Sequence, residues 1–173
     1  MHKTAVYVGR FNPIHRGHTA IISHMIETFG VENCLFIIGS SNAPLSLRHF
    51  FSYDERRTFI KKIFPEIRLA GLPDFPEDRD WLAALDDIIK LGGIDPQNTT
   101  YFGGCDEDIR FFKDDGRGCA IINRFDGSTA KISATEIRDA LIHDRPIKEW
   151  VHEGVHDDVV KGFKEKWERF KQI

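Results

Sequence analysis

The residues best suited to chemistry gather in one short stretch, Gly9 to His18. It holds two histidines three positions apart, His15 and His18, which can reach the same anion. Its arginines, Arg10 and Arg16, carry donors that suit phosphate oxygens, and its glycines and proline shape a sharp turn. A histidine pair alone would more simply cap a turn, but this combination predicts a phosphate site.

A second stretch, Ile132 to Arg138, offers matching chemistry. Ser133 and Glu136 form a capping box, which predicts that a helix begins here. The hydroxyls of Ser133 and Thr135 lie at that helix start, and a guanidinium follows one turn later. Because helix N-termini attract anions, two such starts that meet would hold phosphates from both sides.

The elements that must position these stretches alternate along the chain. Apolar runs of strand length alternate with amphipathic segments at helical spacing, which predicts an α/β fold with a doubly wound, Rossmann-like parallel sheet of about five strands and helices on both faces. The expected strands are 5–8, 34–38, 67–72, 99–102 and 119–122, and the expected helices are about 19–29, 52–64, 81–91, 106–112 and 133–141. Ligands of such sheets bind beyond the carboxyl ends of the strands, where both stretches would lie.

Length and composition set the remaining bounds. The 173 residues fit a single domain, 1–173, with helices from Pro146 onward (about 146–173) as a C-terminal extension packed on it. The formal net charge of -3 lacks the basic excess of nucleic-acid binders, and no apolar segment has signal or membrane length. Cys34, Cys105 and Cys119 are widely spaced and predict reduced thiols in a cytoplasmic protein.

Both stretches resemble the signatures of the nucleotidylyltransferase superfamily. Gly9 to His18 is similar to its G-x-F-x-P-x-H-x-G-H loop, and Ile132 to Arg138 to its I-S-x-T-x-x-R helix start. Within the superfamily, the chain most resembles the nicotinamide mononucleotide (NMN) adenylyltransferases of the archaeal type. Asn12 stands where that group usually has glutamine, Ile14 where phenylalanine is common, and the segment 103–106 lacks an expected asparagine.

The resemblance implies transfer of the adenylyl group of ATP to NMN, which gives NAD and pyrophosphate, with Mg²⁺ brought by ATP. It assigns catalysis to His15, His18 and Arg138; ATP and phosphate binding to Gly9, Arg10, Phe11, Gly17, Arg48, Ile132, Ser133 and Thr135; and the mononucleotide to Asp80 and Trp81. ATP and a mononucleotide are the expected partners, with no nucleic acid and no membrane. The family often oligomerises, so a homo-oligomer stays open.

Several alternatives also stay open. The acceptor can instead be pantetheine phosphate, FMN or nicotinate mononucleotide, and CTP can replace ATP as the donor. The segment His152 to His156 matches the H-E-x-x-H helix of zinc hydrolases, although Gly154 weakens that helix and more naturally separates two short ones. A non-catalytic nucleotide sensor is a third class. Trp81 lies on an apolar helix stripe, so its ring faces either the ligand or the core.

Overall fold

A single parallel sheet forms the centre of the computed structural model, which describes residues 2–122 and 132–172. Its five strands lie in the order β3-β2-β1-β4-β5. They are β1 (Ala5–Gly9), β2 (Cys34–Ile38), β3 (Leu69–Gly71), β4 (Thr100–Gly103) and β5 (Cys119–Ile121). The sequence-based prediction of a parallel five-stranded α/β sheet is therefore confirmed.

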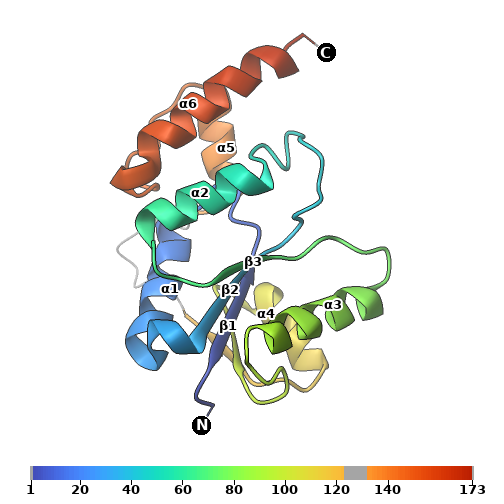
Figure 1. Ribbon diagram of the computed structural model, residues 1–173. Helices are drawn as coiled ribbons and strands as arrows, with labels where there is room; N and C mark the ends of the chain where they lie inside the picture. The colour runs from blue at the N-terminus through green and yellow to red at the C-terminus, as the bar shows by residue number, and fades with distance from the viewer. Residues whose placement is uncertain (1, 123–131, 173) are drawn as a thin grey trace.

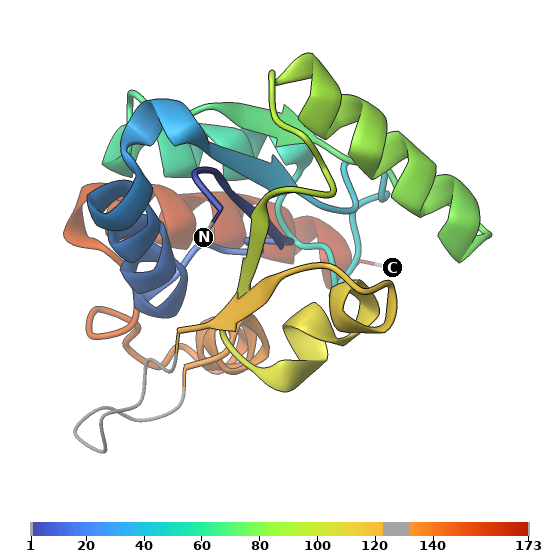
Figure 2. The same cartoon turned by 90° about the horizontal axis from the view of Figure 1, so that it is seen from below.

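Helices cover both faces of this sheet, as Figures 1 and 2 show. One face carries α3 (Asp78–Leu91) and α4 (Asp106–Asp114), and the other carries α1 (Arg16–Phe29), α2 (Tyr53–Ile63) and α5 (Ala134–Ile142). The long C-terminal helix α6 (Glu153–Phe170) packs along α2 and α5 (Figure 1). A short 3₁₀ helix, η1 (Val31–Asn33), leads into β2.

The central strands explain this layering because their side chains alternate between two hydrophobic clusters. Ala5 and Tyr7 of β1 join the cluster beneath α1, α2, α5 and α6, whereas Val6 joins the cluster beneath α3 and α4. All five residues of β2 are buried, as the continuous apolar run 34–38 predicts for a strand covered on both faces. No helix within the described residues is long and apolar enough to cross a bilayer.

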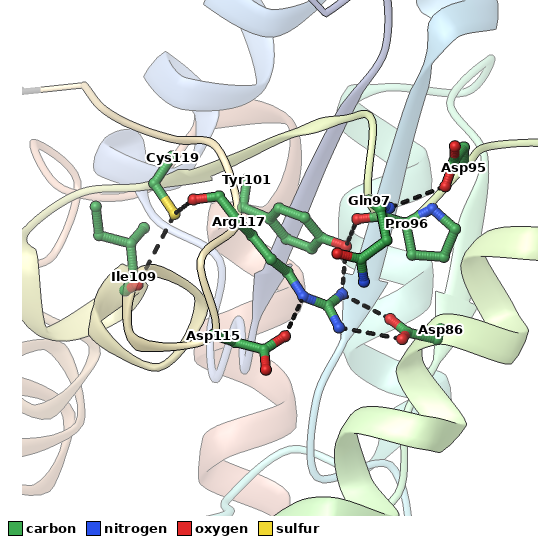
Figure 3. Close-up of polar contacts among 9 residues, drawn as sticks. All are labelled: Asp86, Asp95, Pro96, Gln97, Tyr101, Ile109, Asp115, Arg117 and Cys119. Atoms are coloured by element: carbon green, nitrogen blue, oxygen red, sulfur yellow. Dashed lines mark hydrogen bonds and ion pairs between the residues drawn. The ribbon is translucent and has the colours of Figure 1, made fainter.

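A buried ion-pair network fastens α3 to the sheet (Figure 3). The Arg117 guanidinium binds both carboxylate oxygens of Asp86 on α3, at 2.6 and 3.1 Å, and its Nε donates to Asp115 at 2.8 Å. It also donates to the Tyr101 hydroxyl at 2.7 Å, and that hydroxyl donates to the Pro96 carbonyl at 2.9 Å. Burial alone would lower the pKa of Arg117, but these hydrogen bonds outweigh it and raise the pKa.

The C-terminal region differs from the prediction. Instead of a helix from Pro146, a single turn forms in which Trp150 and Val151 both donate to the Ile147 carbonyl. The Trp150 carbonyl points away from this turn and accepts the N–H of Arg16 at 2.8 Å, at the start of α1. Two short helices around Gly154 are also wrong, since Gly154 lies in the first turn of the continuous helix α6.

Candidate active site

A pocket of about 590 Å³ opens beyond the carboxyl ends of the central strands. The chain leaves β1 toward α1 on one face and leaves β4 toward α4 on the other, so the pocket lies where the strand order reverses. The residues predicted from the sequence that line it are Gly9, Arg10, His15, His18, Trp81, Ile132 and Ser133. The structure thus brings both stretches that were predicted to bind phosphate and the aromatic residue of α3 to one cavity.

The two histidines lie against each other in the pocket wall. Their rings stack with centroids 3.7 Å apart. The Nδ1 of His15 accepts the N–H of Gly17 at 3.1 Å, and the Nδ1 of His18 accepts the N–H of His15 at 3.2 Å. In their neutral forms both rings must therefore carry their proton on Nε2. The two Nε2–H groups make the pair suited to donate to phosphate oxygens.

The start of α1 is not the array of open N–H groups that the sequence suggested. His15 caps the helix and forms a capping box with His18, and its Nδ1 also takes up the N–H of Gly17. The N–H of Arg16 is bound to the Trp150 carbonyl. The N–H groups of His15, Arg16 and Gly17 are thus all satisfied within the protein, so the imidazoles, more than the helix end, present the polar groups of this segment.

Phe11 sets the position of His18 from below. Phe11 has a left-handed backbone (φ 50°) and is buried, with its ring centroid 4.8 Å from that of His18 and 5.3 Å from that of Tyr7. A Cβ at Gly9 would lie 2.9 Å from Cζ of the Phe11 ring, so only glycine fits here. Gly9 and Phe11 thus shape the cradle, by which we mean the loop from Gly9 to His18, although Phe11 itself does not line the pocket.

Asn12 ties the loop to the start of α2. Its side chain donates to the Phe51 carbonyl at 3.1 Å and accepts the Phe51 N–H at 2.9 Å, and Asn12 is buried. The carbonyl of Asn12 accepts a hydrogen bond from Nη1 of Arg138 at 2.8 Å. The residue that departs from the resembled group is therefore fully engaged in holding the loop.

Arg138 joins the two motifs across the site. Besides Asn12, its guanidinium binds the Thr135 hydroxyl at 3.3 Å, which places α5 directly on the first loop. Burial, Arg10 and Arg48 together lower the pKa of Arg138. Arg48 and Thr135 are exposed and lie outside the pocket lining, as does Arg138. Arg10, Arg48 and Arg138 nevertheless form a cluster of positive charge around the pocket.

The hydroxyl of Ser133 is used by the helix cap. It accepts the N–H of Glu136 at 3.1 Å and donates to the Glu136 carboxylate at 3.0 Å, as the predicted capping box requires. Ser133 still lines the pocket together with Ile132 and Ala134. The backbone of this helix start, more than the Ser133 hydroxyl, is therefore the surface that α5 offers a ligand.

Aromatic side chains form another part of the pocket wall. Trp81 is half-buried, with its ring edge-on to Phe111 at 5.4 Å between centroids, and both rings line the cavity. Trp81 therefore belongs to the hydrophobic cluster and to the pocket wall at once. Asp80, by contrast, is exposed, pairs with Arg79 at 3.6 Å and does not line the pocket.

Among the pocket residues that sequence reasoning missed are two carboxylates and a thiol. Asp74 follows β3 and accepts the Ser40 hydroxyl at 2.9 Å, and Asp108 on α4 accepts the Gly104 N–H at 2.9 Å. Both lie just beyond strand ends, where the fold rule alone would have placed them. Cys105 also lines the pocket, but burial raises the pKa of its thiol, so it is not an activated nucleophile.

The H-E-x-x-H segment does not form a zinc-protease helix. His152 precedes α6 as its N-cap, where Nδ1 accepts the N–H of Gly154, and Nδ1 of His156 lies 2.9 Å from Asp157. The required pair of histidines on one helix face is thus absent from this segment. Residues 2–122 and 132–172 contain no group of three or more His, Cys, Asp or Glu placed to hold a metal ion.

Known proteins resemble this chain, in part over nearly its whole length. The nicotinamide-nucleotide adenylyltransferase of Thermococcus sibiricus is 28% identical over 177 residues, covering 97% of this chain and 88% of the relative. A phosphopantetheine adenylyltransferase of Thiobacillus denitrificans is 32% identical over 89 residues, covering 47% of this chain and 52% of the relative.

Among solved structures, a bifunctional NMN adenylyltransferase/ADP ribose pyrophosphatase from Francisella tularensis superposes with a TM-score of 0.77 at 18% identity. The match covers 95% of this chain, which spans 50% of that protein, and it shows a shared fold. The profile of the cytidylyltransferase-like family matches residues 6–140, which include the first loop and all but the end of α5. The chain therefore belongs to the cytidylyltransferase-like family.

Proposed function

We propose that this protein transfers the adenylyl group of ATP to nicotinamide mononucleotide and releases NAD and pyrophosphate. The observation that carries the proposal is that His15, His18, the start of α5 and Trp81 all line one pocket. Similarity to nicotinamide-nucleotide adenylyltransferases over nearly the whole chain supports the same reaction.

The reaction needs positioned charge more than a protein nucleophile. An oxygen of the mononucleotide 5′-phosphate forms a bond to the α-phosphorus of ATP while the bond from that phosphorus to the β-phosphate oxygen breaks. In our proposal, Nε2–H of His15 and of His18 donate to the oxygens of the reacting phosphate, where negative charge grows. Their Nδ1 atoms are anchored on backbone N–H groups, so both donors are oriented before the substrate arrives.

The arginines give the part of the pocket that would bind phosphate its positive charge. Arg10 and Arg48 both act on Arg138 to lower its pKa, so the three cations repel one another in the ligand-free protein. A polyphosphate relieves this repulsion by supplying compensating charge. We therefore assign phosphate binding to this cluster, with Arg138 also holding the first loop against α5.

Magnesium would enter with ATP. Because the described residues offer no three-ligand metal group, the ion would keep mostly phosphate and water oxygens as ligands. When bound, it would neutralise charge on the triphosphate, and the carboxylates of Asp74 and Asp108 lie in the pocket wall for water-mediated contact.

Trp81 supplies the surface for the base of the acceptor. Its indole lines the pocket and is braced by Phe111, so it can stack on a flat ring without an ordering cost of its own. We assign it to the nicotinamide ring of the mononucleotide. The three widely spaced cysteines support the cytoplasm as the proposed location, because reduced thiols are typical of cytoplasmic proteins.

A panel of acceptors tests the proposal. The protein is incubated with Mg²⁺ and ATP, or with CTP, plus NMN, nicotinate mononucleotide, pantetheine phosphate or FMN, and pyrophosphate release is measured. We expect the highest kcat/KM with ATP and NMN. Turnover on pantetheine phosphate or FMN, together with no turnover on either pyridine mononucleotide, would show that the acceptor assignment is wrong.

A further inference from the structure

The side chain of Arg56 lies buried beneath the phosphate end of the pocket, although an arginine on a helix would normally be a surface residue. It belongs to α2, which lies over the end of the sheet toward which β1 and β2 run (Figure 1). The residue is only 1% exposed, and it ranks first by volume among the fully buried side chains of the described chain. A charge buried this deeply costs free energy unless its hydrogen bonds are satisfied.

The guanidinium is satisfied by carbonyl groups from three separate segments. Nη1 donates to the carbonyls of Arg10 and Gly39, both at 2.8 Å, and Nη2 donates to the carbonyl of Ser40 at 3.0 Å. Nε donates to the Ser52 carbonyl at 3.3 Å. One side chain therefore ties the loop after β1, the end of β2 and the start of α2 together.

Three of these carbonyl groups belong to residues that line the pocket. Arg10, Gly39 and Ser40 all contribute to its wall. Ser40 has a left-handed backbone (φ 49°), which a non-glycine residue adopts only when its surroundings hold it there. The Ser40 hydroxyl in turn fixes Asp74, so the hold of Arg56 on Ser40 extends to a second part of the wall.

The charge of Arg56 also suits this place. All four of its side-chain hydrogen bonds within the described residues go to neutral carbonyls, whose negative ends converge on the guanidinium. Burial lowers the pKa of Arg56, Arg10 lowers it further, and Tyr53 and Asp74 partly counter this. A guanidinium remains protonated nonetheless, so the cation stays beneath the pocket.

We propose that Arg56 is a positioning residue for adenylyl transfer, which holds the ends of β1 and β2 in the geometry that binds the triphosphate and masks their carbonyl dipoles. It acts through Arg10, Gly39 and Ser40 and does not itself line the pocket. The inference rests on the proposed function, because it assumes that the pocket binds ATP.

The test compares Arg56→Lys and Arg56→Ala with Arg57→Ala, a change at the exposed neighbouring position of the same helix. Lysine keeps the charge but replaces the three nitrogens that reach these four carbonyls with a single nitrogen. Because small misplacements in an active site cost about 100-fold in rate, we expect both Arg56 variants to lose about that factor in kcat. Arg57→Ala should stay within threefold of the wild type, and circular dichroism should show folded protein throughout.

Chemical rescue separates positioning from a general loss of stability. Guanidinium chloride at low millimolar concentration should raise kcat of Arg56→Ala about tenfold, whereas sodium chloride at equal ionic strength should not. Rates of Arg56→Lys and Arg56→Ala within threefold of the wild type would overturn the proposal. Failure of both variants to fold at the assay temperature would also overturn it, since Arg56 would then serve stability alone.

An ATP titration keeps this test independent of the acceptor. If the wild type turns over none of the acceptors, the proposed function fails, and calorimetric titration with Mg²⁺–ATP then decides the role of Arg56. We expect the Kd of Arg56→Lys for Mg²⁺–ATP to be about tenfold higher than that of the wild type, a change of about 1.4 kcal/mol. An unchanged Kd in the folded variant would refute the positioning role.

Discussion

Replacing Arg117 with methionine should weaken the fold far more than breaking a surface ion pair. The Arg117 side chain is 1% exposed, and the substitution removes the partner of Asp86, whose side chain is 20% exposed. Losing one member of a fully buried pair costs about 3–5 kcal/mol, and the partial access of water to Asp86 puts the cost near the lower end. Asp115 is 39% exposed, so its lost contact adds less than about 1 kcal/mol.

Thermal unfolding at pH 7 measures this cost. For a chain of this length, a loss of about 3 kcal/mol should lower Tm by about 6–12 °C. Lys113→Met is the matched control, because Lys113 forms an ion pair with Asp106 and the two side chains are 54% and 65% exposed. That change should cost less than about 1 kcal/mol.

A double variant checks the reasoning. Asp86→Leu combined with Arg117→Met removes both charges and should be more stable than Arg117→Met alone, since no buried carboxylate is left without a partner. Because α3 also carries Trp81, Arg117→Met should raise KM for the mononucleotide more than KM for ATP. Equal Tm losses in Arg117→Met and Lys113→Met would refute the account of this network.

Two further predictions concern the cradle and the core. Gly9→Ala should lower kcat by about 100-fold with little loss of folded protein, because the new methyl group pushes the Phe11 ring against His18. Steady-state kinetics and circular dichroism measure these two effects, and an unchanged kcat would contradict the prediction. Burial raises the pKa of Tyr101 to about 12 and that of Cys34 to about 11. As the pH rises, the unfolded chain therefore loses these protons before the folded protein does. The free energy of unfolding should fall between about pH 9 and 12, by up to about 1.4 kcal/mol per pH unit for each group. Urea unfolding at pH 8, 10 and 11 measures the fall, and a flat profile would show that neither group is buried as described.

The sheet could be predicted from the sequence because its signals are local. The apolar run 34–38 is too continuous for a half-exposed strand, and the structure buries all of it. The starts of two helices could be predicted in the same way, because the capping boxes at Ser52 and Ser133 both form. The segment after Pro146 was misjudged because its outcome depends on a distant partner, the N–H of Arg16.

The site was predicted only as far as its motifs reach. The two stretches meet as expected, but the sequence does not show that the N–H groups of Arg16 and Gly17 are hydrogen-bonded within the protein. Arg56 was not among the predicted site residues, although it lies three residues before Phe59 on the buried stripe of α2. A cation on an apolar stripe was the signal, and the carbonyls that satisfy it come from segments far away in the sequence.

Formation of NAD from ATP and nicotinamide mononucleotide, followed in the wild type and in His18→Ala, tests the central claim most directly. We predict equal amounts of NAD and pyrophosphate from the wild type. The folded His18→Ala variant should bind ATP but turn over at least about 100-fold more slowly, because it lacks one oriented donor at the reacting phosphate. Absence of NAD with the wild type, or full activity in His18→Ala, would contradict the account.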